Sequence, residues 1–335
     1  MKAGLIGLPG SGRETIFRAL TAQSPGHPSE LKQGEAIVPD TRLDFLSNLY
    51  KPKKHTPARL ELILPKPAGK TPAESFKAVL EKSRDQDVLL KVIRNFSDPA
   101  GNGPEPETEA LNLETELILA DYLTVEKRLE KLSEEKKRGK KNDPEELSLL
   151  TEARELLEAN KPLRLSGRLS ANPKTRGFGF LSAKPVLTLF NCPDDFAAPA
   201  PGAGELYLKG RLEEEFSQLS AEEALEFMSD YGLTELGRDL VIRTLYEMMN
   251  LISFFTVGED ECRAWTIRRG QEALNAAGEI HSDIQKGFIR AEVVAFDDFR
   301  AAGNMSEAKK KGVFRLEGKT YQVKDGDIVH FRFNI

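Results

Sequence analysis

A glycine-rich segment near the start of the chain has the spacing of a phosphate-binding loop. Gly7, Gly10 and Gly12 stand between a short apolar run and a segment with helical spacing. In such loops successive backbone N–H groups point at a phosphate, and the following helix adds its N-terminal dipole. The complete pattern is G-x-x-x-x-G-K-[ST], in which Lys contacts the β- and γ-phosphates and the hydroxyl binds Mg²⁺. The predicted contacts with a phosphate-bearing ligand are Gly7, Gly10, Ser11, Gly12, Arg13, Glu14 and Thr15.

Two of these positions depart from the pattern. Arg13 replaces Lys and keeps the charge, but a guanidinium and an ammonium are not interchangeable at a close-packed site. Glu14 replaces the hydroxyl. At about 4 Å and an effective dielectric near 20, two like charges repel by about 4 kcal/mol, against the roughly 8 kcal/mol of a micromolar complex. The Glu14 carboxylate could therefore repel phosphate, bind Mg²⁺ or point outward, and the loop could bind weakly or be only a turn.

A second polar motif follows an apolar run later in the chain. Asn191-Cys192-Pro193-Asp194 reads N-x-x-D, close to the N-K-x-D pattern that recognises a nucleotide base. A carboxylate at the last position can accept two hydrogen bonds from guanine. A turn at the end of a strand is the alternative interpretation. Asn191 and Asp194 are the predicted base contacts.

The elements around these motifs alternate between strand and helix. Such alternation predicts an α/β fold, with loops at the carboxyl ends of parallel strands. The segment 24–35, rich in Pro, Gly and Ser, is predicted to be a loop. Predicted strands are 2–7, 60–64, 88–93, 184–191 and 206–208, and predicted helices are 15–22, 73–82, 221–231 and 236–250.

A different pattern interrupts this alternation after the linker-like segment 97–106. Apolar residues recur at alternating intervals of four and three, which is typical of a coiled-coil seam. Asp143 and Pro144 have the types expected at the start of a second helix. The basic segment 136–141 between the helices is either a solvated turn or a contact for RNA phosphates. The seam residues are Leu111, Thr115, Ile118, Tyr122, Val125, Leu129 and Leu132.

Composition excludes several classes of protein. A chain of 335 residues suggests two or three domains, and a net charge of −5 gives no general attraction to nucleic acid. Cys192 and Cys262 form neither a disulfide framework nor a metal-binding pattern, as expected in a reducing cytosol. No apolar run approaches the roughly 20 residues of a membrane span, and no signal-peptide pattern is present. We therefore expect a cytoplasmic protein without a membrane partner.

The last third of the chain is predicted to be β-rich, because Val329, Phe331 and Phe333 alternate with polar residues. Three stretches here, FFTVGEDECRAWTIRRG, AAGEIHSDIQKGFIRAEVVAFDDF and RLEGKTYQVKDGDIVHFRFNI, resemble the C-terminal TGS domain of the YchF (Obg-like) ATPase family. The front of the chain, GLPGSGRETIFRALT, is similar to that family's GLPNVGKSTLFNALT, and VPDTRLDFL (38–46) also has a counterpart. The resemblance covers essentially the whole chain.

The resemblance implies an α/β fold with three parts. A P-loop NTPase (TRAFAC GTPase-like) domain would span residues 1–104 and 181–250. An inserted helical coiled-coil hairpin would span 107–175, and a β-grasp TGS domain would span 251–335. It also implies binding of ATP or GTP with Mg²⁺, adenine being preferred in the family, and association with ribosomes or RNA without readout of DNA sequence.

The chain departs from this family in the elements that support Mg²⁺ and hydrolysis. The family's D-x-x-G element corresponds to segment 62–70, where Gly69 matches the Gly but the Asp is missing near Pro65. No Thr stands between Thr21 and Thr41 to serve as the family's switch Thr. Phosphoryl transfer depends on positioning and charge neutralisation. We therefore expect weak nucleotide binding, impaired hydrolysis, and no catalytic or metal-binding residue that the sequence identifies. The alternative is an interaction scaffold that binds no nucleotide and acts through the TGS-like domain.

Overall fold

The computed structural model describes residues 1–21, 32–219, 223, 228 and 235–334. Contacts divide the chain into two compact units, Met1–Glu35 with Glu61–Val241 and Ala36–Leu60 with Ile242–Ile335. Residues 36–60 are thus grouped with the C-terminal part and not with the predicted first domain, 1–104 and 181–250. The three-domain division otherwise stays a prediction.

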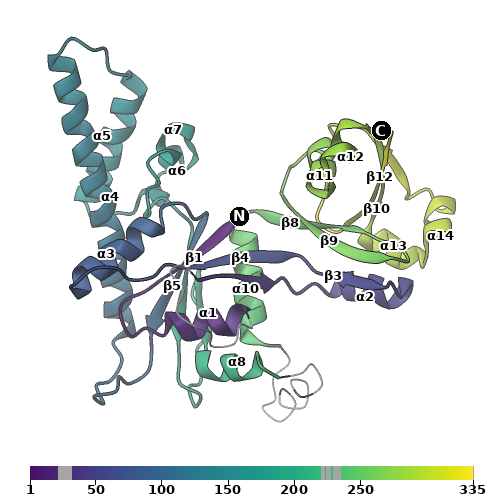
Figure 1. Cartoon of the computed structure of the whole chain (residues 1–335), viewed down its shortest axis with the longest axis horizontal. Helices are drawn as coiled ribbons and strands as arrows, with labels where there is room; N and C mark the ends of the chain where they lie inside the picture. Colours follow the sequence, from purple (N-terminus) through teal and green to yellow (C-terminus); the bar gives the residue numbers. More distant parts are fainter. Residues whose placement is uncertain (22–31, 220–222, 224–227, 229–234, 335) are drawn as a thin grey trace. The chain divides into compact units, whose positions relative to one another are not determined.

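A six-stranded sheet forms the centre of the first unit, in the order β2-β4-β1-β5-β6-β7 (Figure 1). β1 is parallel to both β4 and β5, and β6 is parallel to both β5 and β7. Strands of this kind are covered on both faces, which explains the nearly continuous apolar runs in β1 and β5. The strands are β1 (Lys2–Ile6), β2 (Lys32–Ile37), β4 (Arg59–Leu64), β5 (Val88–Arg94), β6 (Val186–Asn191) and β7 (Glu205–Leu208).

The predicted α/β alternation is confirmed, with two differences. β2 begins at Lys32, inside the segment expected to be a loop. The predicted helix 221–231 lies almost entirely outside the described residues. The helices that accompany the sheet are α1 (Arg13–Thr21), α3 (Pro72–Lys82) and α8 (Gly210–Phe216). The predicted helix 236–250 is α10 (Gly237–Met248), and the boundary between the two units falls within it.

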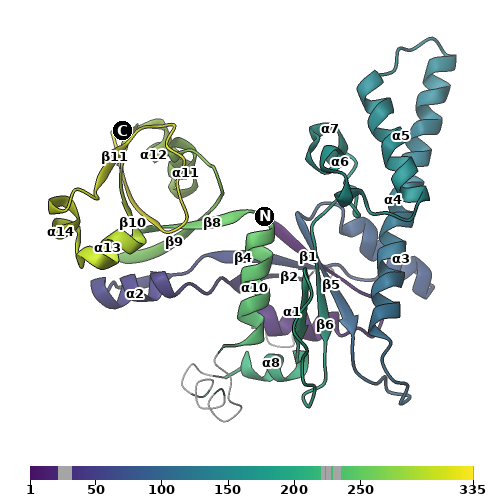
Figure 2. The same ribbon diagram turned by 180° about the vertical axis from the view of Figure 1, so that it is seen from behind.

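A long helical hairpin follows β5, and Figure 2 shows its two helices side by side. α4 (Pro106–Lys137) is followed by α5 (Pro144–Glu158), whose N-terminus is capped by the Asp143 side chain. From Ile118 onward the predicted seam packs against α5. Its first members do not, because Leu111 is 61% exposed and Thr115 is also exposed. There α4 instead buries Leu113 and Leu117 in the cluster over the sheet.

A buried carboxylate bonds the hairpin to the segment that leads back to the sheet. Asp121 is fully buried and accepts bonds from the backbone N–H groups of Leu181 and Ser182, at 2.9 and 2.7 Å. The Arg84 guanidinium lies 3.3 Å from the same carboxylate. These bonds connect α4 to the segment that returns to β6. That segment contains a 3₁₀ turn (Leu163–Leu165), α6 (Gly167–Ala171) and α7 (Pro173–Arg176).

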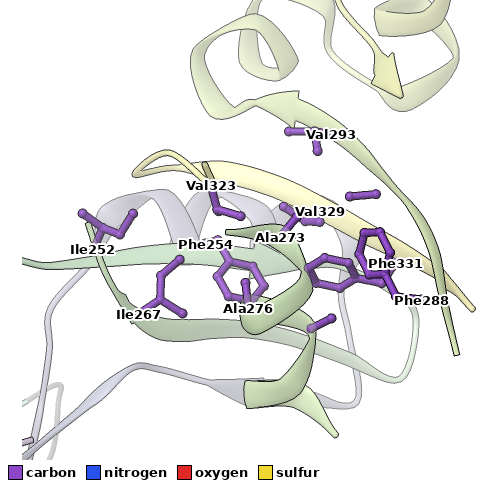
Figure 3. Packing of buried hydrophobic residues seen from close by; sticks show 12 residues of the cluster. Ile252, Phe254, Ile267, Ala273, Ala276, Phe288, Val293, Val323, Val329 and Phe331 are labelled. Atoms are coloured by element: carbon purple, nitrogen blue, oxygen red, sulfur yellow. The ribbon is translucent and has the colours of Figure 1, made fainter. Parts of the chain in front are cut away.

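The second unit contains a mixed six-stranded sheet in the order β11-β10-β12-β8-β9-β3. Figure 3 shows its core, where Phe254, Phe288 and Phe331 form one cluster with Ala273 and Ala276 of α11. β3 comes from the segment 36–60 and runs parallel to β9, with Lys54 opposite Glu261. Its strands are β3 (Lys54–Thr56), β8 (Leu251–Thr256), β9 (Glu261–Arg268), β10 (Phe288–Ala295), β11 (Arg315–Glu317) and β12 (Asp327–Phe333). Its helices are α2 (Thr41–Tyr50), α11 (Ala273–Ile280), α12 (Ser282–Lys286), α13 (Phe296–Ala302) and α14 (Met305–Lys310).

Candidate functional site

The loop between β1 and α1 requires glycine at its first position. A Cβ on Gly7 would lie 2.5 Å from the carbonyl oxygen of Val92 and 2.6 Å from the Ser11 hydroxyl, closer than real Cβ atoms approach. Gly10 and Gly12 have φ angles of +84° and +83°, which residues with a Cβ rarely adopt. The glycine spacing seen in the sequence therefore corresponds to a tight loop that leads directly into α1.

Asn191 attaches the end of β6 to this loop. Its side-chain amide donates to the carbonyl oxygen of Ser11 at 3.1 Å, and the residue is only 4% exposed. A Cβ on Gly12 would lie 2.2 Å from the Asn191 Nδ2 atom, and one on Gly210 would lie 2.4 Å from its Oδ1 atom. Both glycines are therefore needed for Asn191 to fit. Gly210 was missed in the sequence analysis, although a Lys-Gly pair directly after a predicted strand was a usable signal.

The Ser11 hydroxyl points across the loop toward Gly7. Ser11 is 1% exposed, and its Oγ atom has no hydrogen-bond partner within the part of the chain that the structure describes. Leaving a buried hydroxyl unpartnered costs about 1–3 kcal/mol.

Arg13 folds back over the loop and reaches the end of the neighbouring strand. Its Cδ atom is 3.2 Å from the position that a Gly7 Cβ would take, and its Nη1 atom donates to the carbonyl oxygen of Pro65 at 3.5 Å. This distance is at the limit of a hydrogen bond, so the contact is weak. Burial lowers the pKa of the Arg13 guanidinium, and the charge of Glu14 acts in the opposite direction.

The Glu14 side chain lies on the outer surface of α1. It is 65% exposed, and its carboxylate is 3.7 Å from the Arg18 guanidinium. Arg18 in turn bonds Glu214 on α8 at 2.5 Å. Of the three possibilities left open by the sequence, this arrangement corresponds to a carboxylate that points outward.

The residues around the loop do not fit the Mg²⁺ ion that the family resemblance implies. Mg²⁺ is held by carboxylate and hydroxyl oxygens near the phosphates. Here position 14 carries an outward carboxylate, and β4 is followed by Pro65, which offers only a carbonyl oxygen already near Arg13. Among the described residues there is no group of three or more His, Cys, Asp or Glu side chains that could hold a metal.

The structure brings only part of the predicted base motif to the loop. Asn191 contacts it, whereas Asp194 is exposed three residues later. Cys192 between them is 3% exposed, and burial raises the pKa of its thiol. Because a reactive cysteine needs a low pKa and access, this thiol is a buried structural group.

A cavity of about 220 Å³ lies next to this motif. Its wall includes Cys192, Tyr207, Lys209 and Glu213. Glu213 is 5% exposed, and one carboxylate oxygen accepts from the backbone N–H of Gly237 at 2.6 Å. Its other oxygen has no partner among the described residues, and burial raises the pKa of the carboxyl group.

Comparison with known proteins relates the whole chain to one family. Residues 251–334 match the family YchF-GTPase_C, described as a protein of unknown function. A protein of Bacillus subtilis named ribosome-binding ATPase YchF is 37% identical over 367 residues, covering 100% of both chains. Its namesake in Escherichia coli O157:H7 is 35% identical over 364 residues, covering 100% of this chain and 99% of that one.

A solved structure gives the same relationship. The YchF GTPase of Schizosaccharomyces pombe superposes with a TM-score of 0.84 at 27% identity, covering 99% of this chain and 97% of that one. The predicted fold class is thereby confirmed: a P-loop GTPase-like part, a helical hairpin and a C-terminal TGS-like part. No helix among the described residues has the length and apolar character that crossing a membrane requires. This protein belongs to the YchF family.

Proposed function

We propose that this protein binds ATP or GTP weakly at the Gly7–Thr15 loop and hydrolyses it poorly, while associating with ribosomes in the cytoplasm. The observation that carries nucleotide binding is the retained shape of the loop. Gly7 and Gly12 let the loop backbone pack closely against Val92 and Asn191, and Asn191 holds the loop at Ser11.

Poor hydrolysis follows from the groups that are missing. The γ-phosphate gains charge in the transition state, and enzymes of this class neutralise it with Lys, Mg²⁺ and positioned side chains. Here Lys is replaced by Arg13, and Pro65 stands near the position of the D-x-x-G Asp. Binding tolerates these losses better than catalysis does, because binding does not require transition-state stabilisation.

Ribosome association is inferred from the relatives that are named ribosome-binding ATPases. In this chain the C-terminal part and the exposed basic tip, Lys136, Lys137, Lys140 and Lys141, are its proposed contacts. Co-sedimentation with ribosomes tests this idea. Neutralising the four lysines should weaken association and make it less sensitive to salt. Association that is unchanged by this substitution and by removal of residues 251–335 would contradict it.

An interaction scaffold without nucleotide is the second candidate. The observation that favours it is the contact of Arg13 with Pro65, which occupies the guanidinium within the protein. Calorimetric titration with ATP and with GTP separates the two candidates. Micromolar to millimolar binding of either nucleotide supports the first, and its absence supports the scaffold. Phosphate release measured on the same samples tests the expected lack of turnover.

A further inference from the structure

We infer that this protein binds nucleotide phosphates without Mg²⁺, with the Arg13 guanidinium supplying the positive charge that Mg²⁺ and Lys supply elsewhere in the family. The inference rests on the proposed nucleotide binding and specifies its chemistry. The metal-free nucleotide binds with at least the affinity of its Mg²⁺ complex.

The loop lacks the oxygen ligands that Mg²⁺ needs. A P-loop normally offers Mg²⁺ a hydroxyl at the position after the Lys. Glu14 occupies that position, and its carboxylate is 65% exposed and paired with Arg18 on the outer surface of the helix. Turning it inward would break the Arg18 contact and bury a charge. The described residues near the loop therefore offer no oxygen ligand at the usual place.

Arg13 offers a positive charge beside the loop. Its side chain runs over Gly7, so its guanidinium lies at the mouth of the loop, between the loop and the end of β4. A guanidinium stays charged at neutral pH and offers a planar fork that pairs with two phosphate oxygens at once. Its contact with the Pro65 carbonyl is long, at 3.5 Å, and can be exchanged for a charged acceptor.

The groups at the start of α1 suit an anion rather than a cation. The first N–H groups of this nine-residue helix have no acceptor within the helix, and the helix dipole places partial positive charge at the same end. These N–H groups and the Arg13 guanidinium are donors. Metal-free ATP carries more negative charge than its Mg²⁺ complex, so this donor set should bind it at least as well.

Calorimetry on the full chain tests the inference, with ATP titrated once in excess EDTA and once in millimolar Mg²⁺. We expect dissociation constants in the two buffers that agree within about threefold, or tighter binding in EDTA. Binding that is about tenfold or more tighter in Mg²⁺ would overturn the inference while leaving the proposed nucleotide binding intact. No binding in either buffer would overturn both.

Two variants identify the group responsible. Arg13→Gln removes the guanidinium charge and should weaken ATP binding in EDTA by about tenfold or more. Arg211→Gln is the matched control, because Arg211 is 80% exposed on α8 and pairs with Glu215 one turn along the same helix. It should change the affinity by less than about twofold. An Arg13→Gln protein that is folded by circular dichroism and binds ATP like the native chain in EDTA would refute the assignment.

Discussion

The side-chain amide of Asn191 lies 3.1 Å from the carbonyl oxygen of Ser11, so the base motif and the phosphate loop are directly bonded. In the sequence these two residues are 180 positions apart, and the motif was interpreted as a base contact. The bond gives Asn191 a second role, since it fixes the loop in the shape that the glycines permit.

Replacing Asn191 by Asp should separate this role from base recognition. Aspartate is nearly isosteric but cannot donate to Ser11, and it places a buried negative charge beside a carbonyl oxygen. We expect a loss of roughly 1–3 kcal/mol in the free energy of unfolding and weaker nucleotide binding. Urea unfolding and calorimetry measure the two effects.

Asp194→Asn is the matched control in the same motif. Asp194 is exposed, so the substitution should leave stability unchanged and alter only the preference between ATP and GTP. Equal destabilisation by the two substitutions would show that Asn191 has no special role in holding the loop.

Gly12→Ala should close the phosphate loop. The new methyl group would lie 2.2 Å from the Asn191 Nδ2 atom, at a φ of +83°. We expect loss of measurable ATP binding and of about 2 kcal/mol or more in stability, since the left-handed backbone alone costs about 1–2 kcal/mol. Calorimetry and urea unfolding again provide the measurements.

Gly101→Ala controls for backbone strain alone. Gly101 has the same φ of +83°, but no atom lies within 4 Å of its Cβ position. The free energy of unfolding of this variant should fall only by the cost of the left-handed backbone. The variant should bind ATP like the native chain. If Gly12→Ala also binds like the native chain, the loop is not the nucleotide site.

Asp121→Ala should destabilise the first unit strongly. The substitution leaves the N–H groups of Leu181 and Ser182 and the Arg84 guanidinium without their buried acceptor. Breaking a buried ion pair on one side typically costs about 3–5 kcal/mol. Urea unfolding measures this loss.

Asp143→Ala is a useful comparison, because Asp143 is a carboxylate on the same hairpin that caps α5 at an exposed position. Its loss should cost only about 1 kcal/mol. A smaller effect at Asp121 than at Asp143 would contradict the role assigned to the buried carboxylate.

Asp121 also marks a limit of what sequence can predict. The spacing predicts the seam from Ile118 to Leu132 correctly, because apolar periodicity reports which face of a helix is buried. The same spacing includes Leu111 and Thr115 in the seam and gives no reason to bury Asp121. α4 changes its packing partner from the sheet to α5 along its length, and one helical pattern cannot encode two partners.

The candidate site could likewise be predicted only in part. Glycine spacing located the loop, since the backbone there needs positive φ angles at Gly10 and Gly12. Residue type alone could not decide where the Glu14 carboxylate points, because this depends on Arg18 one turn later and on Glu214 of a distant helix. The pairing of β3 with β9 was likewise invisible, since a three-residue strand carries no periodic signal.

Glu213→Gln should change how stability depends on pH. Burial raises the pKa of Glu213 above its unfolded value, so its favourable contribution is complete below the unfolded pKa and is lost as pH rises through the folded pKa. Gln does not titrate and still offers an acceptor to the Gly237 N–H group. The variant should therefore be more stable than the native chain near pH 8 and lose this advantage near pH 4, both approximate values chosen around the reference pKa of glutamate.

Glu215→Gln is the control on the same helix, because the Glu215 side chain is 61% exposed. It should show no such pH-dependent gain. A Glu213→Gln variant that is less stable near neutral pH would mean that the ionised carboxylate is needed at the start of α10.

Restoring the family residues at the loop should improve binding without restoring turnover. In the Arg13→Lys, Glu14→Ser double variant, the new hydroxyl offers Mg²⁺ a ligand and the ammonium can reach the β- and γ-phosphates. Binding of ATP should become tighter in Mg²⁺ than in EDTA by about tenfold. Steady-state phosphate release should stay near background, because Pro65 still supplies no carboxylate and the switch Thr is still absent.

Glu14→Gln alone should change the affinity by less than about threefold, since the carboxylate is 65% exposed and screened by water. The gain in the double variant must then come from the added hydroxyl and ammonium, not from removing a charge. Robust Mg²⁺-dependent phosphate release by the native chain would show instead that Glu14 turns inward as a metal ligand, and that the site is adapted for hydrolysis by a different set of residues.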